Sequence, residues 1–340
     1  MNSFGRIFRV HIFGESHGEC VGVTIDGCPA GLPLNAEDFI TDIERRKGGS
    51  KGTTPRKEDD IPQIKTGLFN GKTTGAPITI LFDNTNTRSA DYEKQRAIPR
   101  PGHADFVAHH KFGSHEDYRG SGHFSGRLTV CLVAAGIIAK KLLAPPPPEA
   151  GSGVIVTSTI LEIGGEKDLD KGLQKAIDAK DSIGGIIECT VKGLPVGLGE
   201  PFFDSAESLI AHVVFAIPAI RSIEFGTGAA AAQMFGSIHN DAIINSNGET
   251  KTNHAGGIVG GLTNGNELVF RVVVKPTSST PLEQQSLNWE TNAIEKFAVK
   301  GRHDLCIALR VPVVLEAVTA IVLGHHHHRR RGSSRCRFHH

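Results

Sequence analysis

Aromatic residues, cysteine and net charge are all scarce in this chain of 340 residues. Aromatic side chains make up 6% of it, too few for the stacking platform of a single-stranded nucleic-acid binder. Lysine and arginine number 37 against 36 aspartates and glutamates, so no overall basic field favours a nucleic acid. These shortages favour an enzyme that acts on a small molecule over a nucleic-acid-binding protein.

Paired cysteines and long apolar segments are also lacking. The six cysteines are scattered and form no CxxC pair, which argues against structural zinc and indicates reduced thiols in the cytoplasm. The longest apolar runs, 128–139 and 311–323, are too short to span a bilayer, and the second contains Glu316. We therefore expect a soluble cytoplasmic protein that binds no metal, nucleic acid or membrane.

Glycine, in contrast, is abundant at 40 residues, and it gathers around charged side chains. The segment 100–105 reads Arg-Pro-Gly-His-Ala-Asp, and the glycine-rich segment 117–127 adds two more arginines. Glycine lets the backbone approach a ligand, imidazole moves protons near neutral pH, and guanidinium binds oxyanions. Together the two segments predict acid–base chemistry on an anion.

A second histidine lies in a similar setting. Residues 14–18 read Gly-Glu-Ser-His-Gly after a strand-like segment, so His17 could be presented to a ligand where the backbone comes close. A turn histidine that bonds only locally explains the same pattern, and both interpretations stay open.

Alternating and periodic apolar residues predict the secondary structure. The expected strands cover 8–13, 21–26, 76–82, 154–163, 186–191 and 268–274. The expected helices cover 36–47 with Asn35 as N-cap, 128–143, 168–180, 312–323, and a segment from Asp204 to Ile217 whose capping box pairs Asp204 with Glu207. The helix 128–143 is apolar nearly all round, which is typical of a core helix.

Basic residues gather at the end of the helix 36–47 and in the glycine-rich loop 48–57 after it. They include Arg45, Arg46, Lys47, Lys51 and Arg56. Such a loop can close over a phosphate or carboxylate. Cations that complement the helix dipole, followed by a solvated basic loop, fit equally well.

Three further segments bear on the site and on the domain division. The proline-rich tract 144–153 indicates an extended linker and a possible internal boundary. The segment 253–265 holds two Gly-Gly pairs, which suit either packing against a flat ligand or paired β-bulges. The segment 275–279 places a lysine and three hydroxyl groups at a strand end, where they can bind a phosphate.

The order and spacing of these motifs resemble the chorismate synthase family over residues 4–323. The matching segments are 14–18, 100–105, 117–127, 197–201, 253–265, 275–279 and 302–304. The resemblance implies an α+β fold, a β-α-β sandwich with core helices between two antiparallel sheets, as a single domain over 1–324 in a homotetramer. The tail 325–340 resembles no family end.

The resemblance also implies a reaction. It is the trans-1,4 elimination of phosphate from 5-enolpyruvylshikimate 3-phosphate to give chorismate, the last step of the shikimate pathway to the aromatic amino acids. The enzyme would be a carbon–oxygen lyase that needs reduced FMN although the reaction has no net redox change. NADPH would serve only if the chain also reduces flavin.

Residue roles follow from the same resemblance. His17 is implied as an acid near the leaving phosphate, His103 as an acid near the reduced flavin, and Asp304 as a carboxylate that assists the flavin. Implied flavin contacts are His123, Phe124, Ser125, Gly260, Lys275, Pro276, Thr277, Ser278, Ser279 and Arg302. Arg45 and Lys51 match family positions that contact a phosphate or nucleotide. The other candidate substrate or phosphate contacts, chosen because arginine binds oxyanions in a bidentate way, are Arg46, Arg56, Arg100 and Arg127. The chain departs from the usual family residue at Lys47, Lys51, Ser222 and Leu305.

Two rival interpretations come from other classes of protein. A non-catalytic flavin-binding module would explain the glycine-rich loops and the segment 275–279, but it has no use for two histidines in glycine turns. A metal-dependent hydrolase would draw on His109, His110, His115 and Asp105, whose spacing matches no recognised ligand pattern.

Overall fold

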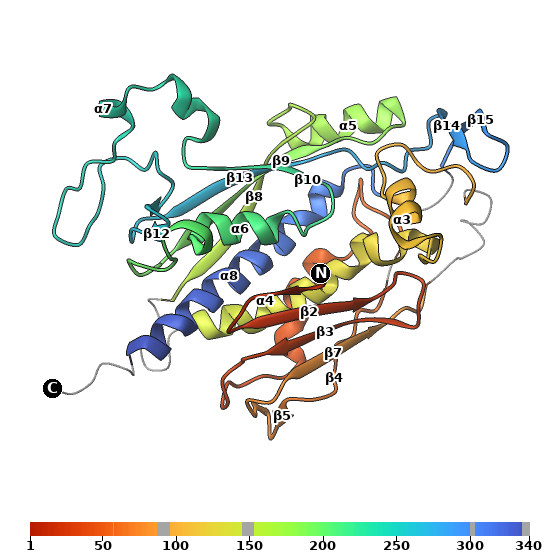
Figure 1. Ribbon diagram of the computed structural model, residues 1–340. Coiled ribbons are helices and arrows are strands. Elements are labelled where there is room, and N and C mark those ends of the chain that lie inside the picture. The colour runs from red at the N-terminus through yellow and green to blue at the C-terminus, as the bar shows by residue number, and fades with distance from the viewer. Residues whose placement is uncertain (57, 87–95, 145–152, 300–302, 335–340) are drawn as a thin grey trace.

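Two antiparallel sheets enclose a pair of long helices (Figure 1). The structure is a computed structural model that describes residues 1–56, 58–86, 96–144, 153–299 and 303–334. The α+β sandwich expected from the sequence is confirmed. The tract 145–152 lies outside the described residues, and the single-domain interpretation of 1–324 stays a prediction.

The first sheet has the strand order β1-β2-β3-β7-β4 and is antiparallel throughout. Its strands are β1 (Ser3–Phe4), β2 (Arg9–Gly14), β3 (Cys20–Asp26), β7 (Ile78–Asp83) and β4 (Gln63–Ile64). Side chains alternate between the two faces of a strand, so the apolar Ile78, Ile80 and Phe82 of β7 all point into the core and are fully buried. A hairpin of β5 (Leu68–Phe69) and β6 (Lys72–Thr73) extends this half.

The second sheet has the order β10-β13-β9-β8 and is also antiparallel. Its strands are β10 (Ile220–Phe225), β13 (Leu268–Val274), β9 (Gly185–Lys192) and β8 (Ile155–Ile163). Two small hairpins lie outside it, β11 (Ile258–Val259) with β12 (Leu262–Thr263) and β14 (Gln284–Asn288) with β15 (Ala293–Phe297).

Helices α4 (Thr129–Leu143) and α8 (Val311–Ser334) lie side by side between the sheets (Figure 1). The other helices are α1 (Ile40–Arg46), α3 (Asp105–Phe112), α5 (Leu169–Ala179), α6 (Ala206–Val214) and α7 (Gly236–His239). Short 3-10 helices are η1 (Ala36–Phe39), η2 (Arg119–Phe124), η3 (Gly126–Leu128), η4 (Phe202–Asp204), η5 (Gly228–Gln233) and η6 (Ile307–Arg310).

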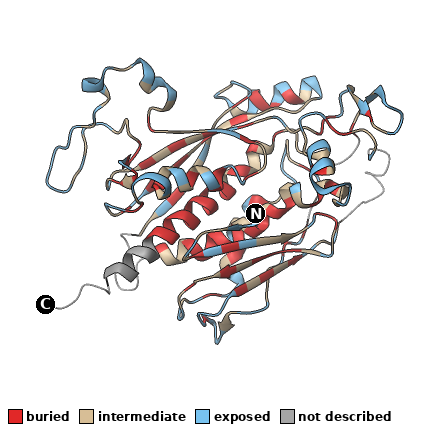
Figure 2. Ribbon diagram, in the orientation of Figure 1, coloured by how far each residue is buried: buried red, intermediate tan, exposed pale blue. Residues whose placement is uncertain are grey.

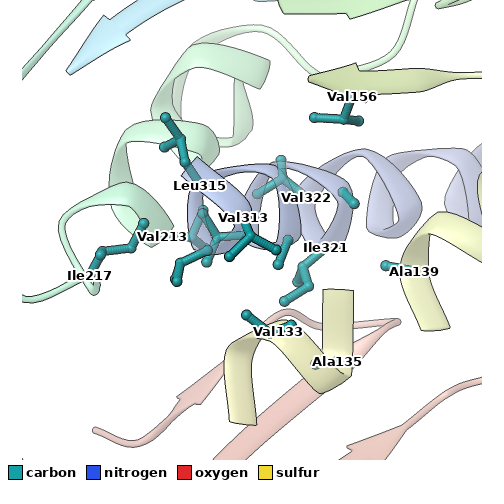
Figure 3. Close-up of a cluster of buried hydrophobic side chains, with 14 of the residues drawn as sticks. Val133, Ala135, Ala139, Val156, Val213, Ile217, Val313, Leu315, Ile321 and Val322 are labelled. Atoms are coloured by element: carbon teal, nitrogen blue, oxygen red, sulfur yellow. The ribbon is translucent and has the colours of Figure 1, made fainter. Parts of the chain in front are cut away.

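The hydrophobic core is centred on α4 and α8, which are buried over most of their described length (Figure 2). Val133 and Ala139 of α4 lie near Val313 and Ile321 of α8 in a cluster that also takes side chains from α6 and β8 (Figure 3). The close approach depends on Gly136, since an ideal Cβ there would lie 2.3 Å from the Cβ of Ala317.

Gly136→Ala is expected to destabilise the fold by about 1–3 kcal/mol, because the added methyl overpacks the α4–α8 contact. The measurement is the free energy of unfolding in urea. The matched control is Gly324→Ala on α8, where the new Cβ would lie 3.5 Å from the Cβ of Ala139, an ordinary contact. A Gly136→Ala protein as stable as the control would contradict this packing.

The start of α6 differs from the prediction. Ser205 is the N-cap, and its side chain accepts a hydrogen bond from the Ser208 backbone N–H at 3.2 Å. Asp204, the predicted cap, lies one residue earlier in η4 and forms an ion pair with Arg6 at 2.6 Å instead. A hydroxyl one position later reaches the free N–H groups of the first turn, so the capping box predicted at Asp204 was wrong.

Helix α8 begins near Pro312 as predicted but continues past Leu323 to Ser334. His325 and His326 are buried, so the start of the tail belongs to the fold. Together with η6, α8 gives an apolar segment, Ile307–His326, that is long enough to cross a membrane by length and composition. The prediction that the apolar run at 311–323 is too short to span a bilayer was therefore wrong for the helix as it folds. However, 78% of that window is buried inside the protein, as in a core helix of a soluble protein.

Candidate active site

A cavity of about 670 Å³ opens where the first sheet, the start of α4 and the end of β13 come together. It is lined by most of the residues that the sequence singles out, from segments far apart in the chain. These are His17, Arg46, Arg56, Arg100, His103, His123, Phe124, Ser125, Arg127, Lys275, Thr277, Ser278, Ser279 and Asp304.

Five of the site residues predicted from the sequence are not among the residues that line the cavity. Arg45, Lys51, Gly260 and Pro276 do not line this cavity, and Arg302 lies outside the described residues. Gly260 and Gly261 form the two-residue turn between β11 and β12, both with positive φ. Their conformation is therefore accounted for by the turn itself.

Arg45 and Arg46 diverge because neighbouring residues of a helix point about 100° apart. Arg45 forms a bidentate ion pair with Glu316 of α8, with its Nη atoms 2.8 and 2.7 Å from the carboxylate oxygens. Arg46 is buried on the cavity side, where its Nη2 lies 2.5 Å from Oδ2 of Asp60.

Asp60 is a buried carboxylate shared by two arginines. Its other oxygen accepts a hydrogen bond from Arg127, whose Nε also donates to Asn84 at 2.9 Å. Burial lowers the pKa of Arg46 to about 10, and Asp60 opposes this, so the guanidinium stays charged at neutral pH. Burial alone would raise the pKa of Asp60, but Arg46 and Arg127 hold it below its ordinary value.

Arg56 is positioned in the same way by Glu58. Its Nη2 lies 2.5 Å from Oε1 of Glu58, and its Nη1 donates to the Ser16 hydroxyl at 3.3 Å. The second oxygen of Glu58 accepts from the backbone N–H and the hydroxyl of Thr85. The loop 48–56 is thereby fastened to the turn that carries His17.

His17 is buried in the turn after β2 and packs against the backbone of Gly120. Gly120 has φ +56°, and an ideal Cβ there would lie 2.1 Å from both Cε1 and Nδ1 of the imidazole. Burial lowers the pKa of His17, the nearby Arg56 lowers it further, and Asp117 opposes both. The neutral imidazole is thus favoured more than in an exposed histidine.

His103 is held between two side chains. Its Nδ1 lies 2.6 Å from Oδ1 of Asp105, and its Nε2 lies 3.0 Å from the Ser121 hydroxyl. Arg100 braces the group, donating from Nε to Asp105 at 2.7 Å and from Nη2 to Ser121 at 3.1 Å. Burial would raise the pKa of Asp105, but Arg100 and His103 hold it well below its usual range.

The segment 275–279 meets this group from the second sheet. Arg100 donates to the Ser279 hydroxyl at 3.0 Å, and Ser278 donates to the carbonyl oxygen of Gly102 at 2.7 Å. Lys275 donates to Ser278 at 2.7 Å, and burial lowers the pKa of its ammonium. The strand end of β13 and the segment 100–103 therefore form one wall.

Asp304 connects the segment before η6 to the loop 48–56. Its Oδ1 accepts from the Thr54 backbone N–H at 2.8 Å, and its Oδ2 lies 3.1 Å from Nη1 of Arg310. Arg310 also donates to the carbonyl oxygen of Arg46 at 2.9 Å. Arg310 was not singled out from the sequence, since an arginine before an apolar helix is unremarkable there.

The segment 123–125 precedes α4. Nδ1 of His123 donates a hydrogen bond to the carbonyl oxygen of Gly14 at 2.8 Å. Ser125 caps η3 by accepting from the Arg127 backbone N–H at 3.3 Å. Phe124 lines the cavity and is 40% exposed, so it contributes apolar surface that is partly open to solvent.

The deciding observation comes from comparison with known proteins. A family model described as chorismate synthase matches residues 8–327. The chain belongs to the chorismate synthase family. A chorismate synthase of Chitinophaga pinensis is 68% identical over 335 residues, covering 98% of this chain and 99% of the relative. A chorismate synthase of Dehalococcoides mccartyi is 43% identical and covers 95% of each chain.

A crystal structure of chorismate synthase matches the fold with a TM-score of 0.71 at 25% identity, covering 95% of this chain and 92% of that chain. Membership in the chorismate synthase family confirms the function and the enzyme class expected from the sequence, a carbon–oxygen lyase of the shikimate pathway.

The structure shows what surrounds three of the residues at which the chain departs from the chorismate synthase pattern. Lys47 ends α1 and pairs with Glu44 at 2.5 Å. Ser222 lies at a register shift between β10 and β13. The carbonyl of Leu305 accepts from the Ile183 backbone N–H at 2.9 Å, which anchors the loop after Asp304.

The rival metal site is not assembled. His109 stacks on Trp289 with ring centroids 4.4 Å apart and hydrogen-bonds Glu116 and Ser114. Within the described part of the chain, no group of three histidine, cysteine or acidic residues could hold a metal ion.

Stability is expected to fall as the pH drops below about 4, the ordinary carboxyl pKa. The folded-state pKa values of Asp60 and Asp105 are depressed, so the unfolded chain binds more protons in this window and acid favours unfolding. Urea unfolding at a series of pH values measures this. Unfolding free energy that stays constant from pH 6 to well below pH 4 would contradict it.

Proposed function

We propose that this chain eliminates phosphate from 5-enolpyruvylshikimate 3-phosphate to give chorismate, with reduced FMN bound in the 670 Å³ cavity. The observation that carries the proposal is the convergence of His17, His103 and five arginines on one cavity. A binding module without chemistry would not need two imidazoles in one cavity.

The charge of the cavity suits this substrate, which carries a phosphate and two carboxylates. Seven lysine and arginine side chains line it against three aspartates and glutamates. Most of the arginines are already oriented by carboxylates of the chain, so an oxyanion would meet guanidinium groups with fixed directions. Preorganised donors of this kind bind without the entropic cost of ordering them.

The residues present also fit a flavin mononucleotide. The Thr277 hydroxyl is buried and makes no hydrogen bond within the described structure, and Lys275 lies beside it on the same wall. A phosphate tail would satisfy both, while Phe124 offers an apolar face for a ring system. When bound, the reduced flavin supplies the electron density that the elimination needs.

The chain's own groups then have separable tasks. Burial and Arg56 lower the pKa of His17, and the negative charge of a bound phosphate would raise it again, so His17 would take up a proton from solvent as the substrate binds and donate it to the leaving phosphate. His103, hydrogen-bonded to Asp105 beside the segment 275–279, serves as the second acid. Asp304 supplies a carboxylate that is held in place by the Thr54 backbone N–H of the loop 48–56.

Several finer features belong to the same proposal. We infer that Arg46, Arg56, Arg100 and Arg127 contact the substrate, and that His123, Ser125 and the segment 275–279 contact the flavin. Arg45, Lys51, Gly260 and Pro276 would contribute only through another conformation or another subunit, and a flavin contact by Arg302 stays a prediction because it lies outside the described residues. We also propose a cytoplasmic homotetramer.

An anaerobic assay with purified protein tests the proposal. Chemically reduced FMN with substrate is expected to yield chorismate, and oxidised FMN alone is expected to yield none. Oxidised FMN with NADPH and no external reductase decides whether the chain reduces flavin itself. Absence of turnover with reduced FMN would overturn the proposal.

A further inference from the structure

Arg310 lines the cavity but has no task in the function proposed above, and two groups of the chain hold its side chain. Its Nε donates to the carbonyl oxygen of Arg46 at 2.9 Å, and its Nη1 lies 3.1 Å from Oδ2 of Asp304. The side chain is still 19% exposed. The guanidinium group is therefore fixed in direction while part of it stays accessible.

The Nη2 group of Arg310 makes no hydrogen bond within the described residues, so its two N–H groups are left for a ligand. The other arginines that line the cavity are occupied more fully. Arg56, Arg100 and Arg127 each donate from all three side-chain nitrogens to groups of the chain. The Nε of Arg46 has no partner in this part of the chain, but that atom is buried. Arg310 thus offers the least occupied guanidinium group in the cavity.

The surroundings of Arg310 carry excess positive charge. Asp60 is shared by Arg46 and Arg127. Among the described residues, Arg310 pairs with one carboxylate, that of Asp304. Burial lowers the pKa of Arg46, and the positive charges of Arg310 and Arg127 lower it further, so the three guanidinium groups repel one another. An anion bound beside them would relieve that repulsion.

We propose that Arg310 binds a carboxylate of the substrate through its Nη2 group. This inference rests on the function proposed above, in which the substrate carries two carboxylates and a phosphate. Arg56 is better placed for the phosphate, because it donates to the Ser16 hydroxyl beside His17, the acid for the leaving group. Arg310 is held instead at Asp304 and the end of α1, so a different oxyanion of the same substrate would reach it.

The chain contains a matched control outside the cavity. Arg271 of β13 also bridges a carboxylate and a backbone carbonyl. Its Nη2 lies 2.7 Å from Oε2 of Glu188, and its Nη1 donates to the carbonyl oxygen of Gly226 at 2.9 Å. Its side chain is 32% exposed, and it does not line the 670 Å³ cavity. Replacing Arg271 therefore removes a comparable pair of contacts away from the site.

The test compares Arg310→Gln and Arg310→Lys with Arg271→Gln and Arg271→Lys in calorimetric titrations of the flavin-free protein with substrate. Arg310→Gln is expected to raise the substrate Kd about 10- to 100-fold, which is typical of a hydrogen bond between charged groups. Arg310→Lys should raise it at least about threefold, since an ammonium keeps the charge but loses the planar geometry of the guanidinium. Both Arg271 variants should keep the wild-type Kd.

Two further readouts identify which oxyanion Arg310 binds. The Kd for FMN should change less than about threefold in Arg310→Gln, because the proposed flavin phosphate contacts lie in the segment 275–279. The inhibition constant of inorganic phosphate as a competitor of the substrate should also stay at its wild-type value. A phosphate inhibition constant or an FMN Kd that rises as much as the substrate Kd would overturn the assignment to a substrate carboxylate.

Steady-state kinetics separate binding from positioning. An interaction made equally with the bound substrate and with the transition state raises KM more than it lowers kcat, and this is the pattern expected for Arg310→Gln. A fall in kcat with the substrate Kd unchanged would mean that Arg310 acts only by holding Asp304, and would overturn the proposal. A wild-type substrate Kd in Arg310→Lys would overturn it as well, even if Arg310→Gln does not fold.

Failure of the proposed function would give a different result. A wild-type protein that binds the substrate but does not turn it over would refute that function. The comparison of substrate Kd values between the Arg310 and Arg271 variants would still decide the carboxylate contact.

Discussion

Asp60→Asn is expected to lower the free energy of unfolding by about 3 kcal/mol, because removing one partner of a buried ion pair leaves the others uncompensated. Here the others are two guanidinium groups, on Arg46 and Arg127, which are nearly inaccessible to water. Asparagine keeps the size of the side chain and tolerates the positive φ of +50° at this position, so only the charge is lost.

Urea unfolding followed through the single tryptophan, Trp289, provides the measurement. The control is Glu283→Gln, which removes an exposed ion pair with Lys296 whose side chains are 61% and 65% exposed. That variant is expected to lose less than about 1 kcal/mol. Equal effects of the two substitutions would mean that Asp60 does not hold the arginines as described.

Gly120→Ala is expected to lower turnover at least about 100-fold, because a displacement of about 1 Å in a reacting group can cost that much. The new Cβ would overlap the ring of His17, which must move, and the backbone of Gly120 cannot yield since it already has a positive φ. The measurement is kcat under anaerobic conditions with reduced FMN, with circular dichroism to verify the fold.

Gly71→Ala is the control for backbone strain alone. Gly71 lies in the turn between β5 and β6 with φ +70°, and an ideal Cβ there meets nothing within 4 Å. This variant should lose some stability and keep its activity. Wild-type turnover in Gly120→Ala would show that the position of His17 does not matter, and the acid role would fail.

The regular elements were largely predictable because apolar periodicity reports burial directly. The strand Leu268–Val274 has the predicted bounds, and its alternate residues are buried as its pattern requires. The cap of α6 was placed one residue early, since Asp204 and Ser205 are both good caps and only the tertiary contact of Asp204 with Arg6 separates them. The sandwich topology came from the family resemblance and could not be worked out from periodicity.

The sequence predicted which types of residue form the candidate site, but it did not predict which side chains pair with one another there. The sequence could not tell that Arg46 rather than Arg45 faces the cavity, because that depends on which side of α1 meets the core. Asp60 was missed, although the acidic run 58–60 directly after a basic loop was a usable signal. Ser121 gave no signal, since its hydrogen bond to His103 exists only in the folded chain.

The central claim is that this cavity performs an elimination in which reduced flavin is required and not consumed. The most direct measurement follows chorismate, inorganic phosphate and the oxidation state of FMN in a single anaerobic reaction. We expect chorismate and phosphate in equal amounts over many turnovers while the FMN stays reduced. Stoichiometric oxidation of the flavin, or phosphate release without chorismate, would contradict the account.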